Sequence, residues 1–219
     1  MTARGLAIAA VVALAPTIAH ASPELDALVK DVPTCAARTY CFAIRVHVPL
    51  DDRGAPIATA AWIAGQVAAA NQHFEKLDVA FQIDGIGPLP AAAARVEDRK
   101  ERDSFGGRLS RKVIDWFVTG QLDDIDIPGA QVFGVTWRRG DRKFVIVSTQ
   151  ARERTLAHEL GHFFGLPHST YAISIMNKTP REEPPPEART FADEEYARMK
   201  PRVKDAVRSR IVANVKRRR

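Results

Sequence analysis

The sequence predicts a mixed α/β domain in which strands and helices alternate along the chain. Three observations support this fold class. Residues 42–48 alternate apolar and other side chains with the period of a strand. Residues 56–77 carry apolar side chains on one face at helical spacing. Residues 155–164 combine an apolar stripe with two histidines four positions apart, which predicts a second helix of distinctive chemistry after the strands.

The first third of the chain is expected to contain a strand, a helix and a second strand. His47 falls on the polar side of the strand over 42–48, and His73 is expected at the surface or an interface of the helix. Neither histidine is given a chemical role. The second strand, residues 79–83, is expected to end in the Gly- and Pro-containing segment 84–88, because these residues interrupt strands.

The middle of the chain is expected to add three strands. Residues 91–104 are charged and predicted to be helical or mobile. Residues 112–118 are rich in apolar side chains and predict a buried third strand. Residues 132–137 and 144–148 predict two strands joined across residues 139–142.

The C-terminal region is expected to form a loop and then helix. Residues 181–189 are rich in proline and charge, which is typical of a stiff surface loop. Thr190 is predicted to cap a final helix that begins near Phe191. Pro201 is expected to break or kink that helix into two pieces.

The run HELGHFFGLPH carries the most specific chemical signal in the chain. His158 and His162 are four positions apart, so on a helix they lie one turn apart and can bind one metal ion. Glu159 is placed beside the metal, where a general base for a zinc-bound water belongs. Gly165 can adopt a left-handed conformation that ends the helix, and the returning chain brings His168 in as third ligand. Three protein ligands leave a fourth position open, as in catalytic zinc sites.

The opposite face of this helix is apolar. The side chains that form it at helical spacing are Leu156, Leu160, Phe163 and Phe164. One face therefore packs into a core while the other lines a cleft. The alternative is that these are ordinary histidines on a buried helix. It is disfavoured because such a helix would not need three histidines, a glutamate and a glycine in register.

The run resembles the metzincin zinc peptidases, whose pattern HExxHxxGxxH it matches at every specified position. Met176, within residues 174–177, resembles the methionine of the Met-turn that lies beneath the metal in that family. The resemblance covers about residues 155–180. The short spacing between His168 and Met176 is most similar to that in matrixin-type or related bacterial enzymes. Lys178 stands where astacins and serralysins carry a tyrosine ligand, which disfavours those two subfamilies.

The resemblance implies a twisted, mostly parallel five-stranded sheet with an antiparallel edge strand, an active-site helix and a small, mainly helical C-terminal subdomain. Residues 132–137 would be the edge strand, to which a peptide substrate adds through main-chain hydrogen bonds. Residues 177–180 would form the wall of the pocket for the substrate side chain that follows the cleaved peptide bond. The implied boundaries are an N-terminal catalytic subdomain over 22–168 and a C-terminal subdomain over 169–219.

Residues 1–21 predict a secretory signal peptide. Arg4 precedes an apolar run over 6–19, and Ala19-His20-Ala21 provides a small-x-small cleavage pattern before Ser22. The alternative, an N-terminal membrane anchor, is disfavoured because the run is short for a span. The mature protein is therefore expected to be secreted or periplasmic, with no transmembrane segment.

The two cysteines follow a short polar lead-in over residues 22–34. Cys35 and Cys41 are close in sequence, and in a secreted protein the pair predicts a small disulfide loop. The alternative is that Cys35 binds the zinc as an inhibitory thiolate, as in matrixin propeptides; only about a dozen residues precede it in the mature chain, and Cys41 offers a partner.

The charge balance suggests no nucleic-acid function. The 219-residue chain has a net charge of +6, and its basic C-terminal end is typical of a solvated helix terminus. No nucleic-acid-binding motif accompanies it. The acidic segment 123–126 could bind calcium, as matrixins often do, although such segments are more often only solvated. We expect a monomer.

These observations predict a secreted zinc metalloendopeptidase that binds one catalytic zinc ion and hydrolyses protein or peptide substrates, with Glu159 as general base. Two alternatives stay open. One is a catalytically silent zinc-binding interaction protein, which would have no need of that carboxylate. The other is a zinc amidase that acts on cell-wall material.

Overall fold

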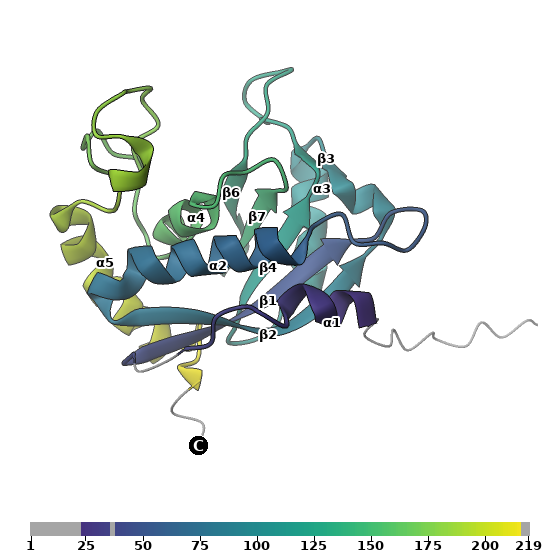
Figure 1. Ribbon diagram of the computed structural model, residues 1–219, viewed down its shortest axis with the longest axis horizontal. Coiled ribbons are helices and arrows are strands. Elements are labelled where there is room, and N and C mark those ends of the chain that lie inside the picture. Colours follow the sequence, from purple (N-terminus) through teal and green to yellow (C-terminus); the bar gives the residue numbers. More distant parts are fainter. Residues whose placement is uncertain (1–22, 36–37, 216–219) are drawn as a thin grey trace, which may run out of the picture.

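The computed structural model describes residues 23–35 and 38–215 (Figure 1). The predicted signal peptide lies outside the described residues. The strands are β1 (Tyr40–Pro49), β2 (Val79–Leu89), β3 (Arg95–Val96), β4 (Ile114–Thr119), β5 (Gln121–Leu122), β6 (Gly134–Arg139) and β7 (Arg142–Ser148). The α-helices are α1 (Pro23–Val29), α2 (Ala60–Phe74), α3 (Arg99–Ser104), α4 (Thr155–Phe163) and α5 (Asp193–Arg208). Short 3-10 helices cover Glu75–Leu77, Ala91–Ala94, Phe105–Arg108 and Pro186–Ala188.

Five strands form one sheet in the order β2-β1-β4-β7-β6. Strands β2, β1, β4 and β7 are parallel, and β6 pairs antiparallel with β7 at the edge. The α/β fold class predicted for the chain, including the antiparallel edge strand, is confirmed. A separate two-stranded parallel sheet consists of β3 and β5.

Apolar layers cover both faces of the sheet because successive side chains of a strand point in opposite directions. Trp116 and Val118 join the larger core, beneath α2 and α4, which lie side by side on that face (Figure 1). Phe117 points the other way, into a smaller core with Phe105 of the 3-10 helix that follows α3. The sheet is therefore held between two layers, and β2 and β6 form its two edges.

The central strand β1 is buried on both faces, so the expectation of a polar side with His47 was wrong. Neighbours β2 and β4 flank β1, and helices or loops cover both of its faces. His47 Nε2 lies 2.9 Å from Asp115 Oδ1, and its ring stacks on Phe117 with centroids 4.3 Å apart. His73 is also buried rather than at the surface, and its Nδ1 lies 3.2 Å from Thr190 Oγ1.

Strand β2 continues through the segment that was expected to end it. Ile44 pairs with Ile83 and Arg45 with Gly85, so Asp84 forms a bulge and pairing resumes beyond it. Pro88 is tolerated because β2 is an edge strand and pairs only with β1. Local glycine and proline signals therefore marked a bulge, not the end of the strand.

Three further expectations about helices also need correction. The polar lead-in contains the short helix α1, whose Leu25 and Leu28 are buried. Helix α5 begins at Asp193 with Ala192 as its N-cap, so Thr190 does not cap it. Pro201 lies inside α5 without dividing it, at an exposed position. None of the described helices is long and apolar enough to cross a membrane.

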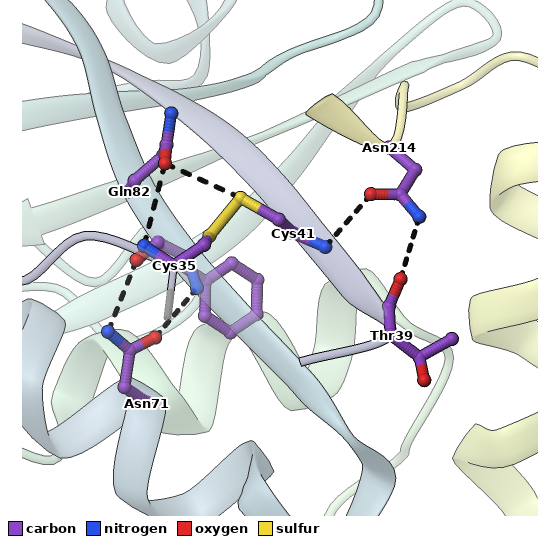
Figure 2. The surroundings of a disulfide bond; sticks show 7 residues. Cys35, Thr39, Cys41, Asn71, Gln82 and Asn214 are labelled. Atoms are coloured by element: carbon purple, nitrogen blue, oxygen red, sulfur yellow. Dashed lines mark hydrogen bonds between the residues drawn. A yellow bond between two sulfur atoms is a disulfide. The ribbon is translucent and has the colours of Figure 1, made fainter. Parts of the chain in front are cut away.

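The predicted disulfide joins Cys35 to Cys41, with the two Cα atoms 5.6 Å apart. It holds the segment before β1 against β2, where Gln82 Oε1 accepts a hydrogen bond from the Cys35 N–H (Figure 2). On the other side, Asn214 Oδ1 accepts from the Cys41 N–H and Asn214 Nδ2 donates to Thr39 O, which ties the C-terminal segment to β1. Because Cys35 is paired with Cys41, the alternative of a zinc-binding thiolate is wrong.

Candidate active site

The three predicted histidine ligands converge on one point. His162 Nε2 lies 3.1 Å from His158 Nε2 and 3.1 Å from His168 Nε2. A tetrahedral zinc ion with Zn–N bonds of about 2.0–2.1 Å holds its ligand nitrogens about 3.3–3.4 Å apart, close to this separation. Among the described residues, this is the one group of three or more His, Cys, Asp or Glu side chains whose ligand atoms converge, and the acidic segment 123–126 forms no such group.

Backbone carbonyls select the tautomer that presents lone pairs at this point. His158 Nδ1 lies 2.8 Å from Ile175 O, and His162 Nδ1 lies 2.7 Å from Leu166 O. A carbonyl can only accept, so each Nδ1 carries the proton and each Nε2 presents its lone pair. Two lone pairs that face each other repel unless a cation lies between them. The donor set therefore fits a zinc ion.

Burial keeps these imidazoles in the form that binds metal. Burial is the largest cause that lowers the pKa of His158 and of His168 to about 4, and it also lowers the pKa of His162. Neutral imidazole is the ligand form. The site is therefore ready for a metal ion at neutral pH.

Gly165 ends α4 and returns the chain toward the metal position, as predicted. Its φ is +92°, a conformation that favours glycine. The Gly165 N–H donates to His162 O at 2.9 Å, and the Leu166 N–H donates to Gly161 O at 2.9 Å. These two bonds form a Schellman motif, which directs the following residues back to place His168 beside His162.

Met176 is fully buried and packs against α4. A Cβ atom added to Gly161 would lie 2.8 Å from Met176 Sδ, so the glycine between Leu160 and His162 allows the methionine to pack directly against α4. The Met176 N–H donates to Ser174 Oγ at 2.8 Å. Ser174 Oγ lies 2.6 and 2.8 Å from the two carboxylate oxygens of Glu195, which is buried at the start of α5. The turn that carries Met176 is therefore anchored to the C-terminal helix.

Glu159 is buried beside the metal position, with 3% of its surface exposed. Burial raises the pKa of Glu159 to about 7, although a hydrogen bond from Thr136 opposes this shift. Thr136 Oγ1 lies 3.0 Å from Glu159 Oε2 and 2.6 Å from the Glu159 carbonyl oxygen. A carboxylate whose pKa is near neutrality can both take up and release a proton at physiological pH.

Gly134 allows the edge strand to approach this carboxylate closely. A Cβ atom at Gly134 would lie 2.8 Å from Thr155 Cγ2 and 2.9 Å from both Cγ and Oε1 of Glu159. We expect Gly134→Ala to displace the Glu159 carboxylate and lower kcat/KM by about 10²-fold, because misplacement of a catalytic group by about 1 Å has that order of effect.

The measurement for Gly134→Ala is peptide hydrolysis together with zinc content. Zinc content should stay at the parent value, because Gly134 does not touch the histidine ligands. Gly107→Ala is the matched control, since a Cβ atom there meets nothing within 4 Å and its φ is not in the left-handed region. Parent-like hydrolysis by Gly134→Ala would show that the close approach does not position Glu159.

A cavity of about 780 Å³ opens in front of the histidines. Its walls are formed by the edge strand β6, by the N-terminal half of α4 and by the segment 175–189. All three histidines and Glu159 line it, and so do Asn177 and Lys178. The cavity therefore exposes the metal position and the carboxylate to a ligand laid along β6.

Sequence reasoning found the three converging histidines but not the residues that position Glu159 and the turn around Met176. Gly134, Thr136, Ser174 and Glu195 belong to elements separate from α4. A glycine inside a predicted strand is a signal of close backbone approach, and it could have indicated Gly134. Ser174 and Glu195 gave no such signal, because 21 positions separate them in sequence.

No protein-family model matches this sequence, and no curated protein matches it. Solved structures do match. Metalloproteinase-II from Bacteroides fragilis superposes with a TM-score of 0.52 at 16% identity, over 83% of this chain and 58% of that one. Archaemetzincin from Methanopyrus kandleri superposes with a TM-score of 0.51 at 18% identity, over 74% of this chain and 96% of that one. The fold is metzincin-like. This chain thus spans little more than half of the Bacteroides fragilis protein.

Proposed function

We propose that this protein is a zinc-dependent endopeptidase. The observation that carries the proposal is the convergence of three imidazole nitrogens beside the buried carboxylate of Glu159, in a cavity that β6 borders. The metzincin-like fold supports it, since the two similar structures include a metalloproteinase. Three protein ligands leave one position for substrate chemistry, whereas structural zinc sites are closed by four.

Zinc, when bound, supplies a Lewis acid that polarises a carbonyl group and lowers the pKa of water. Glu159 takes a proton from the attacking water as general base. The same carboxylic acid then donates that proton to the leaving amine. Thr136 holds the carboxylate in place during both transfers through the bond to Oε2. The pKa of about 7 suits both halves of this exchange.

The edge strand β6 provides a main-chain template for the peptide. It pairs with β7 on one side only, and Val135, Thr136 and Trp137 line the cavity. An extended peptide can add to the free side through N–H and C=O groups, so the main chain contributes affinity and side-chain contacts are left to set selectivity. Such pairing favours an endopeptidase that binds the interior of a chain.

We further propose that the protein acts outside the cytoplasm, in agreement with its expected signal peptide. The Cys35–Cys41 disulfide supports this location, because disulfides persist in oxidising compartments. The resemblance of the motif to matrixin-type sequences, with Lys178 in place of a tyrosine ligand, stays a prediction.

The test compares metal-free protein with protein reconstituted with zinc or with magnesium, each on a mixed peptide library analysed by mass spectrometry. We expect internal peptide bonds to be cleaved only by the zinc form. No cleavage by any form would contradict the peptidase proposal. Cleavage by the metal-free form would contradict the role of the histidine site.

Peptidoglycan fragments added to the same assay address the amidase alternative. Release of peptides from glycan, without cleavage of library peptides, would favour that alternative. If the protein instead binds zinc without turnover, we expect zinc uptake and no hydrolysis of either substrate.

A further inference from the structure

The cavity carries a large excess of positive charge. Eight lysine or arginine residues line it, but only three carboxylates: Asp124, Asp126 and Glu159. Within the described part of the chain, none of these eight cations forms an ion pair with a carboxylate; the ion pairs involve other residues. No ion pair among the described residues neutralises this charge, so it is available to an anionic ligand.

The positive charge is balanced at one end of the cavity. There, Arg102 donates to the carbonyl oxygen of Asp123, and the carboxylates of Asp124 and Asp126 act on it electrostatically. Burial nevertheless lowers the pKa of Arg102, and these carboxylates oppose that effect. Arg102 Nε also has no hydrogen-bond partner among the described residues, but the carboxylates of Asp124 and Asp126 offset the charge of this arginine.

The other end, beside His158, is not balanced. Arg154, the residue before α4, has its Nη1 atom buried without a hydrogen-bond partner. Burial is the largest cause that lowers the pKa of Arg154, and the positive charges of Arg189, Arg152 and Arg181 lower it further. Glu187 is the single carboxylate that opposes them. We call these four arginines (152, 154, 181 and 189) the arginine cluster.

Two members of the cluster are held in place by neutral groups. Arg181 donates to the carbonyl oxygens of Ala172, Ser174, Asn177 and Thr179. Arg189 donates to the carbonyl oxygens of Pro184 and Arg181. These bonds fix the guanidinium groups without neutralising them. The positive potential at this end is therefore built into the loop and does not depend on flexible surface side chains.

The same two segments of the chain carry the cluster and the metal position. Arg154 precedes His158 by four residues, a rise of about 6 Å along a helix. Two neighbouring carbonyl groups connect the cluster to the site. The carbonyl of Ser174 accepts from Arg181, and the carbonyl of the next residue, Ile175, accepts from His158 Nδ1. Arg181 and His158 line the same cavity.

We propose that the arginine cluster is a subsite for a carboxylate of the peptide substrate, close to the bond that is cut, so that the enzyme prefers acidic peptides. A carboxylate matches the planar guanidinium group of Arg154, which lines the cavity. It would also reduce the repulsion among the four arginines. This inference rests on the proposed peptidase function. The carboxylate can come from an Asp or Glu side chain or from the C-terminus of the peptide.

The test uses pairs of quenched fluorescent peptides based on a sequence that the enzyme cleaves. In one set, Gln is replaced by Glu at each of the three positions on either side of the cut; in another, the peptide ends in a free acid or an amide at each of these distances after the cut. We expect at least one acidic peptide to exceed its neutral partner in kcat/KM by about tenfold or more, the order expected for a charge-assisted hydrogen bond. The set of peptides that shows the preference identifies the source of the carboxylate, either a side chain or the C-terminus.

The decisive quantity is the acidic-to-neutral ratio of kcat/KM, measured on one preparation, because a loss of folded enzyme cancels from it. Arg154→Gln should bring the ratio close to one, and Arg154→Glu should reverse it in favour of a Lys-containing peptide. Arg198→Gln is the matched control, an exposed arginine of α5 that does not line the cavity, and its ratio should equal that of the parent.

Equal cleavage of acidic and neutral partners by the parent would overturn the subsite and leave the peptidase function standing. So would a parent-like ratio in both Arg154 variants. If no peptide is cleaved, the peptidase proposal fails, and the subsite is judged by binding alone. Fluorescence anisotropy of the labelled peptides with zinc-loaded Glu159→Gln protein should then show tighter binding of the acidic partner, and equal binding would overturn the subsite.

Discussion

Replacement of Glu159 by glutamine is expected to lower kcat/KM for peptide cleavage by about 10²- to 10⁴-fold, the range associated with loss of a general acid–base group. Glutamine has nearly the same shape, so it can still accept the hydrogen bond from Thr136. It cannot take up a proton from water. The three imidazoles do not depend on this carboxylate for their orientation, because carbonyl groups hold His158 and His162.

The measurement combines hydrolysis of a cleaved peptide with zinc content by atomic emission spectroscopy. Zinc stoichiometry should be unchanged in Glu159→Gln. Glu153→Gln is the matched control, since that glutamate is exposed and does not line the cavity. Parent-like cleavage by Glu159→Gln would exclude the carboxylate as the general base. Absence of cleavage in both the parent and the variant would instead favour a protein that binds zinc without turnover.

Replacement of Glu195 by alanine is expected to destabilise the protein by about 2–4 kcal/mol, from lost hydrogen bonds and a new cavity. This carboxylate is buried, accepts from the Ala192 N–H at 2.8 Å and contacts Ser174 Oγ. Without it, these two buried donors lose their partner. Ser174 would also be free to leave the Met176 N–H, so we expect the turn that carries Met176 to loosen and zinc affinity to fall.

Thermal or urea unfolding of the metal-free protein measures the stability change, and competition with a chelator measures zinc affinity. Glu194→Ala is the matched control, because Glu194 lies in the same first turn of α5 but is exposed. Its effect should stay within about 0.5 kcal/mol, the usual range at exposed positions. Equal stability of the two variants would show that the Ser174–Glu195 contact does not anchor the turn.

The elements that sequence reasoning predicted well are those with a short-range cause. The separation of His158 from His162 is one helical turn, so the helix alone brings them together. Gly165 ends that helix through its own backbone conformation. The Cys35–Cys41 loop closes over a sequence separation of 6. In each case the determining contacts lie within one element or one turn, where spacing and residue type are sufficient.

The expectations that failed depended on neighbours that spacing does not reveal. His47 was placed on a polar face because its own strand alternates, yet β1 is a central strand and both of its faces are covered. Pro88 was taken as the end of a strand, yet β2 lies at the sheet edge, where a missing N–H costs no sheet hydrogen bond. Strand order decides both cases, and it is set by contacts between distant segments.

The sequence by itself determined the chemistry of the candidate site: three imidazoles, one carboxylate and a glycine at spacings that a helix and a tight turn convert into a metal site. Only the tertiary structure decided the surroundings that tune it. Gly134 and Thr136 reach Glu159 from β6, Glu195 anchors the turn from α5, and the other arginines of the cluster gather around Arg154. The physical reason is that ligand spacing is a local backbone property, whereas burial, electrostatic potential and close packing arise where segments far apart in the chain meet.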